Sequence, residues 1–235
     1  MKTSIIFTSY DLTQTMRQIT MKSLENIFKY TDEGYELIWM DTIPKQTFGQ
    51  VYLNPYYVEQ WQFNKRDDRR KIEITDDPGQ YSVYNMGAKE AKGEYLCFFQ
   101  NDVFVPEGWL TDLEWYLDNM LEVDAVFPDQ GLNFRETVKK SYQLEHKEAM
   151  TGTRDAGILF IRRLSFEKIG GWNEGMKTHF GEGDLYGKLS HFIVTQKPMI
   201  THLEHAAGWE RALHEWDRYS ADTTVSAMLK QGLQP

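Results

Sequence analysis

The chain is nearly without cysteine, since Cys97 is the single one among its 235 residues. A lone cysteine excludes a disulfide within the chain and is typical of a reducing compartment, so we predict a cytoplasmic protein. Long hydrophobic runs are missing as well: the longest, 96–99 and 156–161, are far too short to span a bilayer. We expect no basic and apolar leader in the given sequence, because polar residues closely follow its first apolar run. Repeats, low-complexity segments and Ser/Pro-rich linkers are absent too, which favours one domain over residues 1–235.

An excess of basic residues is also lacking. Lys and Arg number 26 against 35 Asp and Glu, which gives a formal net charge of -9. Nucleic-acid binders normally carry a basic stripe, because phosphate neutralisation dominates their affinity, so the charge weighs against a nucleic-acid partner. The one basic run, residues 65–71, is interrupted by acids and is typical of a solvated face. An acidic protein can still bind a phosphorylated small molecule when a divalent metal lies between the two.

Strands and helices alternate along the first hundred residues. Continuous apolar strands between amphipathic helices predict an α/β fold with a Rossmann-like, mostly parallel central sheet and helices on both faces. The first predicted helix carries its apolar residues between Met16 and Phe28, with Asp11 or Thr13 as its candidate N-cap. The predicted strands are Ser4–Phe7, Glu36–Met40, Lys71–Ile74 and Tyr95–Phe99, and the second predicted helix is Val83–Ala91.

Ligands of such sheets bind beyond the carboxyl ends of the strands. In this sequence those ends are Thr8–Asp11, Asp41–Pro44, Asp76–Gly79 and Gln100–Val103, and we expect the chemistry there. The segment 46–64 differs from its surroundings, because it gathers six aromatic residues without a clean period. We interpret it as an inserted hairpin or helix that packs on the sheet edge, in preference to an aromatic platform for sugars or bases.

The segment 85–103 carries most of the functional information. A helix that ends in glycine leads into a buried strand, and the strand delivers Gln100-Asn101-Asp102 to the sheet edge. An acid at the end of a rigid strand is positioned to hold a hard divalent cation, although a single Asp there is ordinarily a cap or turn residue. The segment resembles family 2 glycosyltransferases of the GT-A fold, whose pattern is Asn-x-Gly, three residues, Ala-x-Gly-Glu/Asp-Tyr, an apolar strand and an acidic metal motif. The Gln-Asn-Asp resembles the Asn-Asn-Asp form of a rhamnosyltransferase-like branch.

Three further segments resemble the same family in the right order, and the resemblance extends from residue 4 to about residue 205. Residues 4–10 resemble its opening strand and nucleotide-contacting turn, and Asp41, after the strand Glu36–Met40, matches the acidic position that contacts the nucleoside in this family. Residues 157–174 resemble its segment of a strand followed by Phe-x-Lys-x-Gly-Gly-Phe-Asp-Glu. The aromatic insertion 46–64 and a C-terminal tail, 206–235, are not covered. The resemblance implies that Asp102 holds Mn²⁺ or Mg²⁺ bridging the diphosphate of a nucleotide-sugar donor. The positions it implies for the rest of the donor site are Thr8, Ser9, Tyr10, Asp41, Asn85 and Asn101.

A candidate base and further metal ligands lie later in the chain. Members of the family place acids at a helix start, where one deprotonates the acceptor hydroxyl, and this chain has Glu182-Gly183-Asp184 there. Both acids can instead stabilise the helix dipole; we favour Glu182 as the base, because glycines flank it, and Asp184 as a helix cap. The family also presents a histidine as a third metal ligand, which His202 fits best and His205 second, unless they are ordinary structural or surface histidines.

These residues and the resemblance together predict a metal-dependent glycosyltransferase of the hexosyltransferase type, with a role in polysaccharide biosynthesis. It moves a sugar from a nucleotide diphosphate-sugar to the hydroxyl of a glycan, a lipid-linked or another acceptor, with an inverting or a retaining outcome. One alternative is a non-catalytic sugar- or nucleotide-binding module on the same fold. Another is a nucleotidyltransferase, which needs a basic, Gly-rich loop after the first strand that residues 8–12 lack. The sequence does not decide between a monomer and a homo-oligomer.

Overall fold

A computed structural model describes the chain except for residues 13, 33, 44–66, 130–156, 177–180 and 203–235. The predicted aromatic insertion, the predicted C-terminal tail and His205 therefore lie outside the described residues. Of the helices in the described part, none combines the length and apolar composition needed to cross a bilayer.

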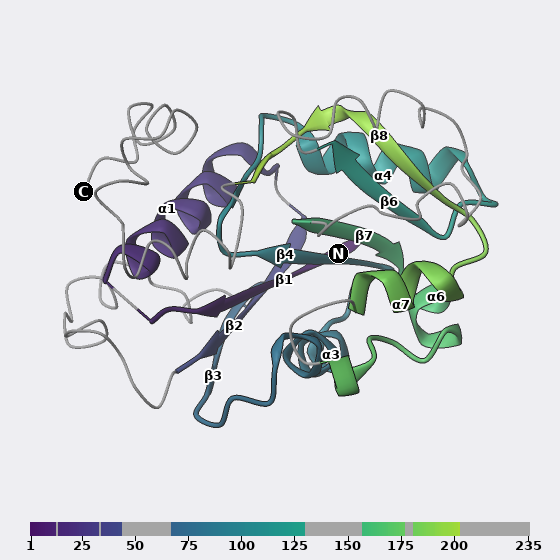
Figure 1. Cartoon of the computed structure of the whole chain (residues 1–235). Helices are drawn as coiled ribbons and strands as arrows, with labels where there is room; N and C mark the ends of the chain where they lie inside the picture. The colour runs from purple at the N-terminus through teal and green to yellow at the C-terminus, as the bar shows by residue number, and fades with distance from the viewer. Residues whose placement is uncertain (13, 33, 44–66, 130–156, 177–180, 203–235) are drawn as a thin grey trace, which may run out of the picture.

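A seven-stranded sheet in the order β3-β2-β1-β4-β7-β6-β8 forms the centre of the described structure (Figure 1). Strands β1 to β4 pair only in parallel with one another, β7 is antiparallel to both β4 and β6, and β8 is parallel to β6. The mostly parallel α/β sheet predicted from the apolar runs is thus confirmed. The strands are β1 Thr3–Tyr10, β2 Tyr35–Thr42, β3 Arg69–Ile74, β4 Tyr95–Gln100, β6 Ala125–Asp129, β7 Ile158–Arg162 and β8 Phe192–Met199, and a separate pair joins β5 Val103–Phe104 to β9 Thr201–His202.

Helices cover both faces of this sheet, as predicted (Figure 1). Successive side chains of a strand point to opposite faces, so Ile5 and Phe7 of β1 pack with helices α1 and α4, whereas Ile6 packs with α3, α6 and α7. All three side chains are fully buried. The helices are α1 Gln14–Tyr30, α3 Gln80–Glu90, α4 Trp109–Asn119, α6 Arg163–Lys168 and α7 Gly181–Lys188, with a short 3-10 helix at Glu174–Met176.

Helix α3 begins three residues earlier than the predicted Val83 start. Gly79 adopts a φ of 92°, in the left-handed region that glycine occupies without a steric penalty, and the helix starts directly after it. The early start brings Tyr81 into the first turn of α3, at the carboxyl edge of the sheet. At the other end, Gly93 turns the chain into β4 with no room for a side chain, because a Cβ there would lie 2.6 Å from the backbone nitrogen of Ser4.

We expect Gly93→Ala to lower the free energy of unfolding by about 1–3 kcal/mol, because the added methyl group meets backbone atoms that cannot move aside. Gly187→Ala is the matched control: apart from the backbone of its own helix, a Cβ at that position in α7 meets no atom of the described residues within 4 Å. Alanine is a better helix former than glycine, so this variant should gain about 0.5–1 kcal/mol. Urea denaturation measures both, and equal effects of the two substitutions would contradict the close approach at Gly93.

Candidate functional site

The parallel strands β1, β2 and β4 bring their carboxyl ends to one edge of the sheet. In the register, Ser9 of β1 lies beside Asp41 of β2, and Thr8 lies beside Gln100 of β4. Thr8 and Ser9 are buried, whereas Tyr10 is partly exposed. Burial raises the pKa of Tyr10, and a hydrogen bond to Asp77 in the β3–α3 turn raises it further. The predicted donor-site residues of β1 and β2 thus share one edge, and the turn after β3 joins them there.

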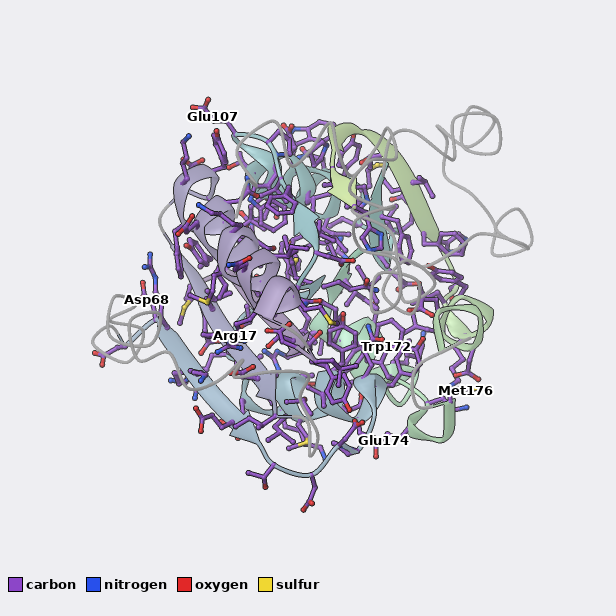
Figure 2. All side chains as sticks on the ribbon, turned by 60° about the vertical axis from the view of Figure 1, so that its left-hand side comes forward. Arg17, Asp68, Glu107, Trp172, Glu174 and Met176 are labelled. Carbon is purple, nitrogen blue, oxygen red and sulfur yellow. The ribbon has the colours of Figure 1, made fainter. Side chains whose placement is uncertain are left out.

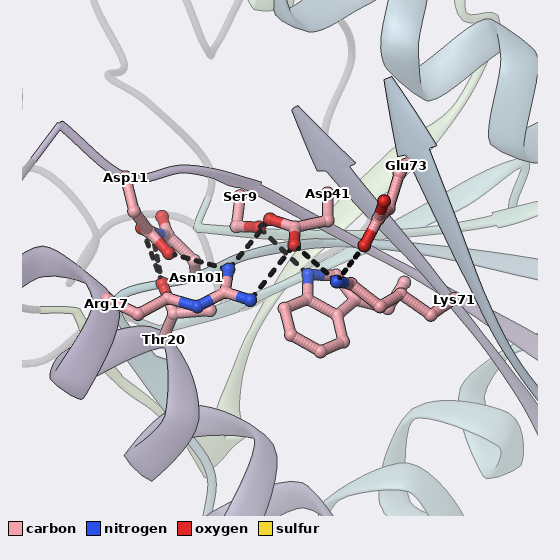
Figure 3. Close-up of polar contacts among 9 residues, drawn as sticks. Ser9, Asp11, Arg17, Thr20, Asp41, Lys71, Glu73 and Asn101 are labelled. Carbon is pink, nitrogen blue, oxygen red and sulfur yellow. Dashed lines mark hydrogen bonds and ion pairs between the residues drawn. The ribbon is translucent and has the colours of Figure 1, made fainter. Parts of the chain in front are cut away.

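The Asp41 carboxylate is fully buried and is surrounded by donors (Figure 3). Its Oδ1 accepts hydrogen bonds from Ser9 Oγ at 2.7 Å and Arg17 Nη1 at 2.8 Å. Its Oδ2 accepts one from Arg17 Nη2 at 3.0 Å and pairs with Lys71 Nζ, also at 3.0 Å. Burial by itself would raise the pKa of Asp41, but the Arg17 and Lys71 charges outweigh it and hold the pKa below its usual value. A carboxylate has about four acceptor positions, so this one is saturated.

Arg17 joins helix α1 to this edge and was not identified from the sequence. Its guanidinium lies 4.7 Å from the ring centre of Trp39 and makes a second contact, from Nη1 to Asp11 Oδ2 at 3.2 Å. Only 5% of the residue is exposed, and Figure 2 shows it inside the molecule, whereas Glu107 points outward. An arginine on a helix is usually a solvated residue, so no local signal separates this one from the others.

Asp11 was predicted as one of two candidate caps for α1, but its side chain ties three elements together. Asp11 Oδ1 accepts hydrogen bonds from Thr20 Oγ1 at 2.7 Å and from Asn101 Nδ2 at 3.0 Å, and Asn101 also donates to Thr20 at 2.8 Å. Asn101, a predicted donor contact, is therefore fixed to α1 next to Asp102. Complete burial raises the pKa of Asp11 to about 6, opposed by Arg17 and assisted by the Asp41 charge.

Two of the three predicted metal ligands lie in contact. Strand β5 pairs Val103 with His202 of β9, and this pairing sets Asp102 Oδ1 3.2 Å from His202 Nε2. Both side chains are buried. Gly157 makes room for the imidazole, since a Cβ there would lie 2.7 Å from the Val103 side chain and 3.2 Å from the His202 ring. A carboxylate oxygen with an imidazole nitrogen is a donor set that Mn²⁺ accepts. Within the described ranges, no three or more His, Cys, Asp or Glu side chains lie close enough together to hold a metal ion.

The predicted base, Glu182, is buried in the first turn of α7. Its Oε2 accepts a hydrogen bond of 2.6 Å from the Tyr81 hydroxyl on α3. The flanking Gly181 packs on the Tyr81 ring, where a Cβ would approach to 2.4 Å. Asp184 lies inside the helix rather than before it, so its prediction as the cap is wrong; its Oδ2 pairs with Lys188 Nζ at 2.6 Å, one turn later. Local spacing did not show that α7 already begins at Gly181.

The predicted donor contact Asn85 joins the two stretches that resemble the family most strongly. Its amide nitrogen donates to the Trp172 carbonyl at 2.9 Å and to Glu174 Oε1 at 2.8 Å, and its oxygen accepts from the Trp172 amide at 3.0 Å. Trp172 lies inside the molecule (Figure 2), where its ring stacks on Tyr81 with centroids 5.1 Å apart and on Tyr84 at 5.5 Å. The segment 166–174 is thus fastened to α3, beside Glu182.

No family model matches this sequence, and no curated protein matches it. Solved structures do resemble it. S. aureus TarS in complex with UDP-GlcNAc superposes with a TM-score of 0.66 at 15% identity, over 87% of this chain and 60% of TarS. The mannosyltransferase PcManGT from Pyrobaculum calidifontis, in complex with GDP-Man and Mn²⁺, gives 0.66 at 16% identity, over 94% of this chain and 63% of that protein. The fold is that of GT-A glycosyltransferases. This chain spans about 60% of the length of the structures it matches.

The opposite pKa shifts of Asp11 and Asp41 give a test of the buried network. Between about pH 4 and 6 the folded protein holds a proton on Asp11 that the unfolded chain has released, so this group makes stability fall as the pH rises. Asp41 has the opposite effect on stability. Its contribution to the free energy of unfolding is present above about pH 4 and is lost as the pH falls through its lowered pKa.

We therefore expect the free energy of unfolding of Asp11→Asn, relative to the wild type, to rise by on the order of 3 kcal/mol from pH 4 to pH 7. The hydrogen bonds that Asp11→Asn loses also change the free energy of unfolding, by an amount that does not depend on pH. Urea denaturation across this range measures the difference. Asp41→Asn is the control and should be destabilised without such a rise. A pH-independent difference for Asp11→Asn would contradict the assignment.

Proposed function

We propose that this protein is a glycosyltransferase that moves a sugar from a nucleotide diphosphate-sugar to an acceptor hydroxyl. The observation that carries the proposal is the buried Asp102–His202 pair beyond the carboxyl end of β4, on a GT-A sheet. Structures with this fold include one bound to UDP-GlcNAc and one bound to GDP-Man and Mn²⁺. We further propose one domain over residues 1–235, the hexosyltransferase type and a role in polysaccharide synthesis.

Asp102 and His202 are the residues that we propose to hold the divalent cation, with His205 as a candidate third ligand outside the described residues. The ion, Mn²⁺ or Mg²⁺, would supply positive charge for the diphosphate that leaves the sugar. Asn101 supports this position, because its bonds to Asp11 and Thr20 fix the backbone that presents Asp102.

For the donor we propose Thr8, Ser9, Tyr10, Asp41, Asn85 and Asn101. Tyr10 is the most exposed among them, with 39% of its surface accessible. The saturated Asp41 would act in this site by holding Arg17 and Lys71, since its acceptor positions are filled. Asn85 would act through the Trp172 loop that it fastens.

Glu182 is the base that we propose for the acceptor hydroxyl. A sugar hydroxyl is a weak nucleophile at neutral pH, so removal of its proton in the transition state accelerates transfer. Glu182 is 8% exposed and is held by Tyr81, whereas Asp184 is neutralised by Lys188.

A non-catalytic binding module on the same fold is a second candidate. The observation that favours it is in the sequence of the metal motif: Gln100-Asn101-Asp102 carries one carboxylate, where the Asp-x-Asp form carries two. Hydrolysis of a nucleotide-sugar or its transfer, measured with Mn²⁺ and with EDTA, distinguishes this module from an enzyme.

The first functional prediction concerns the cation. Asp102→Asn and His202→Ala should each weaken Mn²⁺ binding roughly tenfold or more, since even residues that only support metal ligands cost 10–100-fold. Calorimetry with Mn²⁺ in the presence of UDP or GDP measures the affinity. Asp112→Asn, at a half-buried position in the first turn of α4, is the matched control and should bind as the wild type does. Unchanged affinity in both site variants would remove these residues from the metal site.

The second concerns the base. Glu182→Gln should lower kcat by about 10²–10⁴-fold, because a positioned base contributes that much, while the Kd for the donor stays nearly unchanged. Asp184→Asn, two residues further along the same helix, is the control and should keep most of the turnover. Loss of donor binding in Glu182→Gln would place this acid in the donor pocket instead, and wild-type turnover in both variants would move the base to another segment.

A further inference from the structure

The Tyr81 hydroxyl makes hydrogen bonds to two residues of the described part of the chain, Gly181 and Glu182. The Gly181 amide nitrogen lies 3.1 Å from the hydroxyl oxygen and can only donate, so the oxygen accepts there. The hydroxyl hydrogen is then directed to Glu182 Oε2, at 2.6 Å. A distance this short is typical of a hydroxyl that donates to an ionised carboxylate, where a hydrogen bond is about twice as strong as between neutral groups.

The Tyr81 ring cannot turn away from this contact. Tyr81 is fully buried, and its ring stacks on Trp172 at an interplanar angle of 22°. The backbone of Gly181 also rests on the ring, where even one added carbon would come to 2.4 Å. The hydroxyl is therefore held in place by packing, on a helix that is remote in sequence from Glu182.

We propose that Tyr81 is the positioning residue for Glu182. It fixes the rotation of the carboxylate at the start of α7 and favours its ionised form, which is the form that accepts a proton from the acceptor hydroxyl. This inference rests on the proposed function, in which Glu182 is the base.

The contact has a consequence that mere packing does not have. When the donated hydrogen bond is removed, the ionised carboxylate is less favoured and binds a proton at higher pH. The pH at which kcat falls on the acidic side should then move upward. Other titratable side chains in the described part of this region are Tyr84 on α3, Glu174 beside Asn85, and Tyr186 with the Asp184–Lys188 pair on α7.

The test is Tyr81→Phe, which keeps the ring, its stacking on Trp172 and its contact with Gly181. We expect the acidic limb of the kcat profile to shift upward by about one to two pH units, from the usual strength of a hydrogen bond to a charged group. The donor Kd should stay within about twofold, because Tyr81 acts through Glu182. Tyr84→Phe is the matched control: it lies on the same helix, stacks on the same Trp172 and should keep the wild-type profile.

A second variant covers the case in which Tyr81→Phe does not fold. The replacement of Tyr81 by 3-fluorotyrosine keeps the bond and makes the hydroxyl a better donor, so the acidic limb should move to lower pH. Profiles of the Tyr81 variants that match the wild type, together with lost turnover in Glu182→Gln, would overturn the positioning role and leave the base in place. Wild-type turnover in Glu182→Gln would overturn both the role of Glu182 as base and the positioning role of Tyr81, since Tyr81 would then have no base to position.

Discussion

A single guanidinium, that of Arg17, neutralises two buried carboxylates, and the site edge depends on it. Asp11 and Asp41 are both fully buried, and each contacts Arg17. Removing one partner of a buried ion pair leaves an uncompensated charge, which is far more costly than the net gain of forming the pair. Through these contacts α1 is fastened to the ends of β1 and β2, and through Asn101 to the turn that presents Asp102. The position of the proposed metal ligand is thus set by a charge network that starts on a different helix.

The two faces of the sheet support different parts of the proposed reaction. Arg17 and the β5–β9 pair belong to the α1 side, where they fix the groups proposed for the donor and its cation. Tyr81, Trp172 and Glu182 belong to the side covered by α3 and α7, where aromatic stacking fixes the proposed base. Parallel strands account for part of this division, because α1, α3 and the turn with Asp102 follow the carboxyl ends of β1, β3 and β4, which lie at the same edge. Glu182 on α7 comes after the antiparallel β7 and is joined to α3 through Tyr81.

The first four strands and the fold class could be predicted because they depend on local apolar runs, such as 4–7 and 95–99. The contact of Asp102 with His202 joins residues a hundred positions apart, and only the resemblance to a family suggested that they belong to one site. Arg17 and Tyr81 were missed because their roles arise from burial and from partners on other elements. Asp184 was misassigned because cap patterns describe the residue before a helix, and the helix began at Gly181 through its contact with Tyr81, which no local rule contains.

The charge balance at the site edge gives a physical reason for the proposed cation. The described cations there, Arg17 and Lys71, already pair with acids: Arg17 with Asp11 and Asp41, and Lys71 with Asp41 and Glu73. An anionic diphosphate that approached Asp102 would meet a carboxylate in a chain of net charge -9. Repulsion between like charges is strong where water is excluded, and the buried Asp102 lies in such a place. A divalent ion on the proposed ligands Asp102 and His202 would reverse the local charge and convert this repulsion into attraction. An acidic chain can thereby bind an anionic donor without a basic surface.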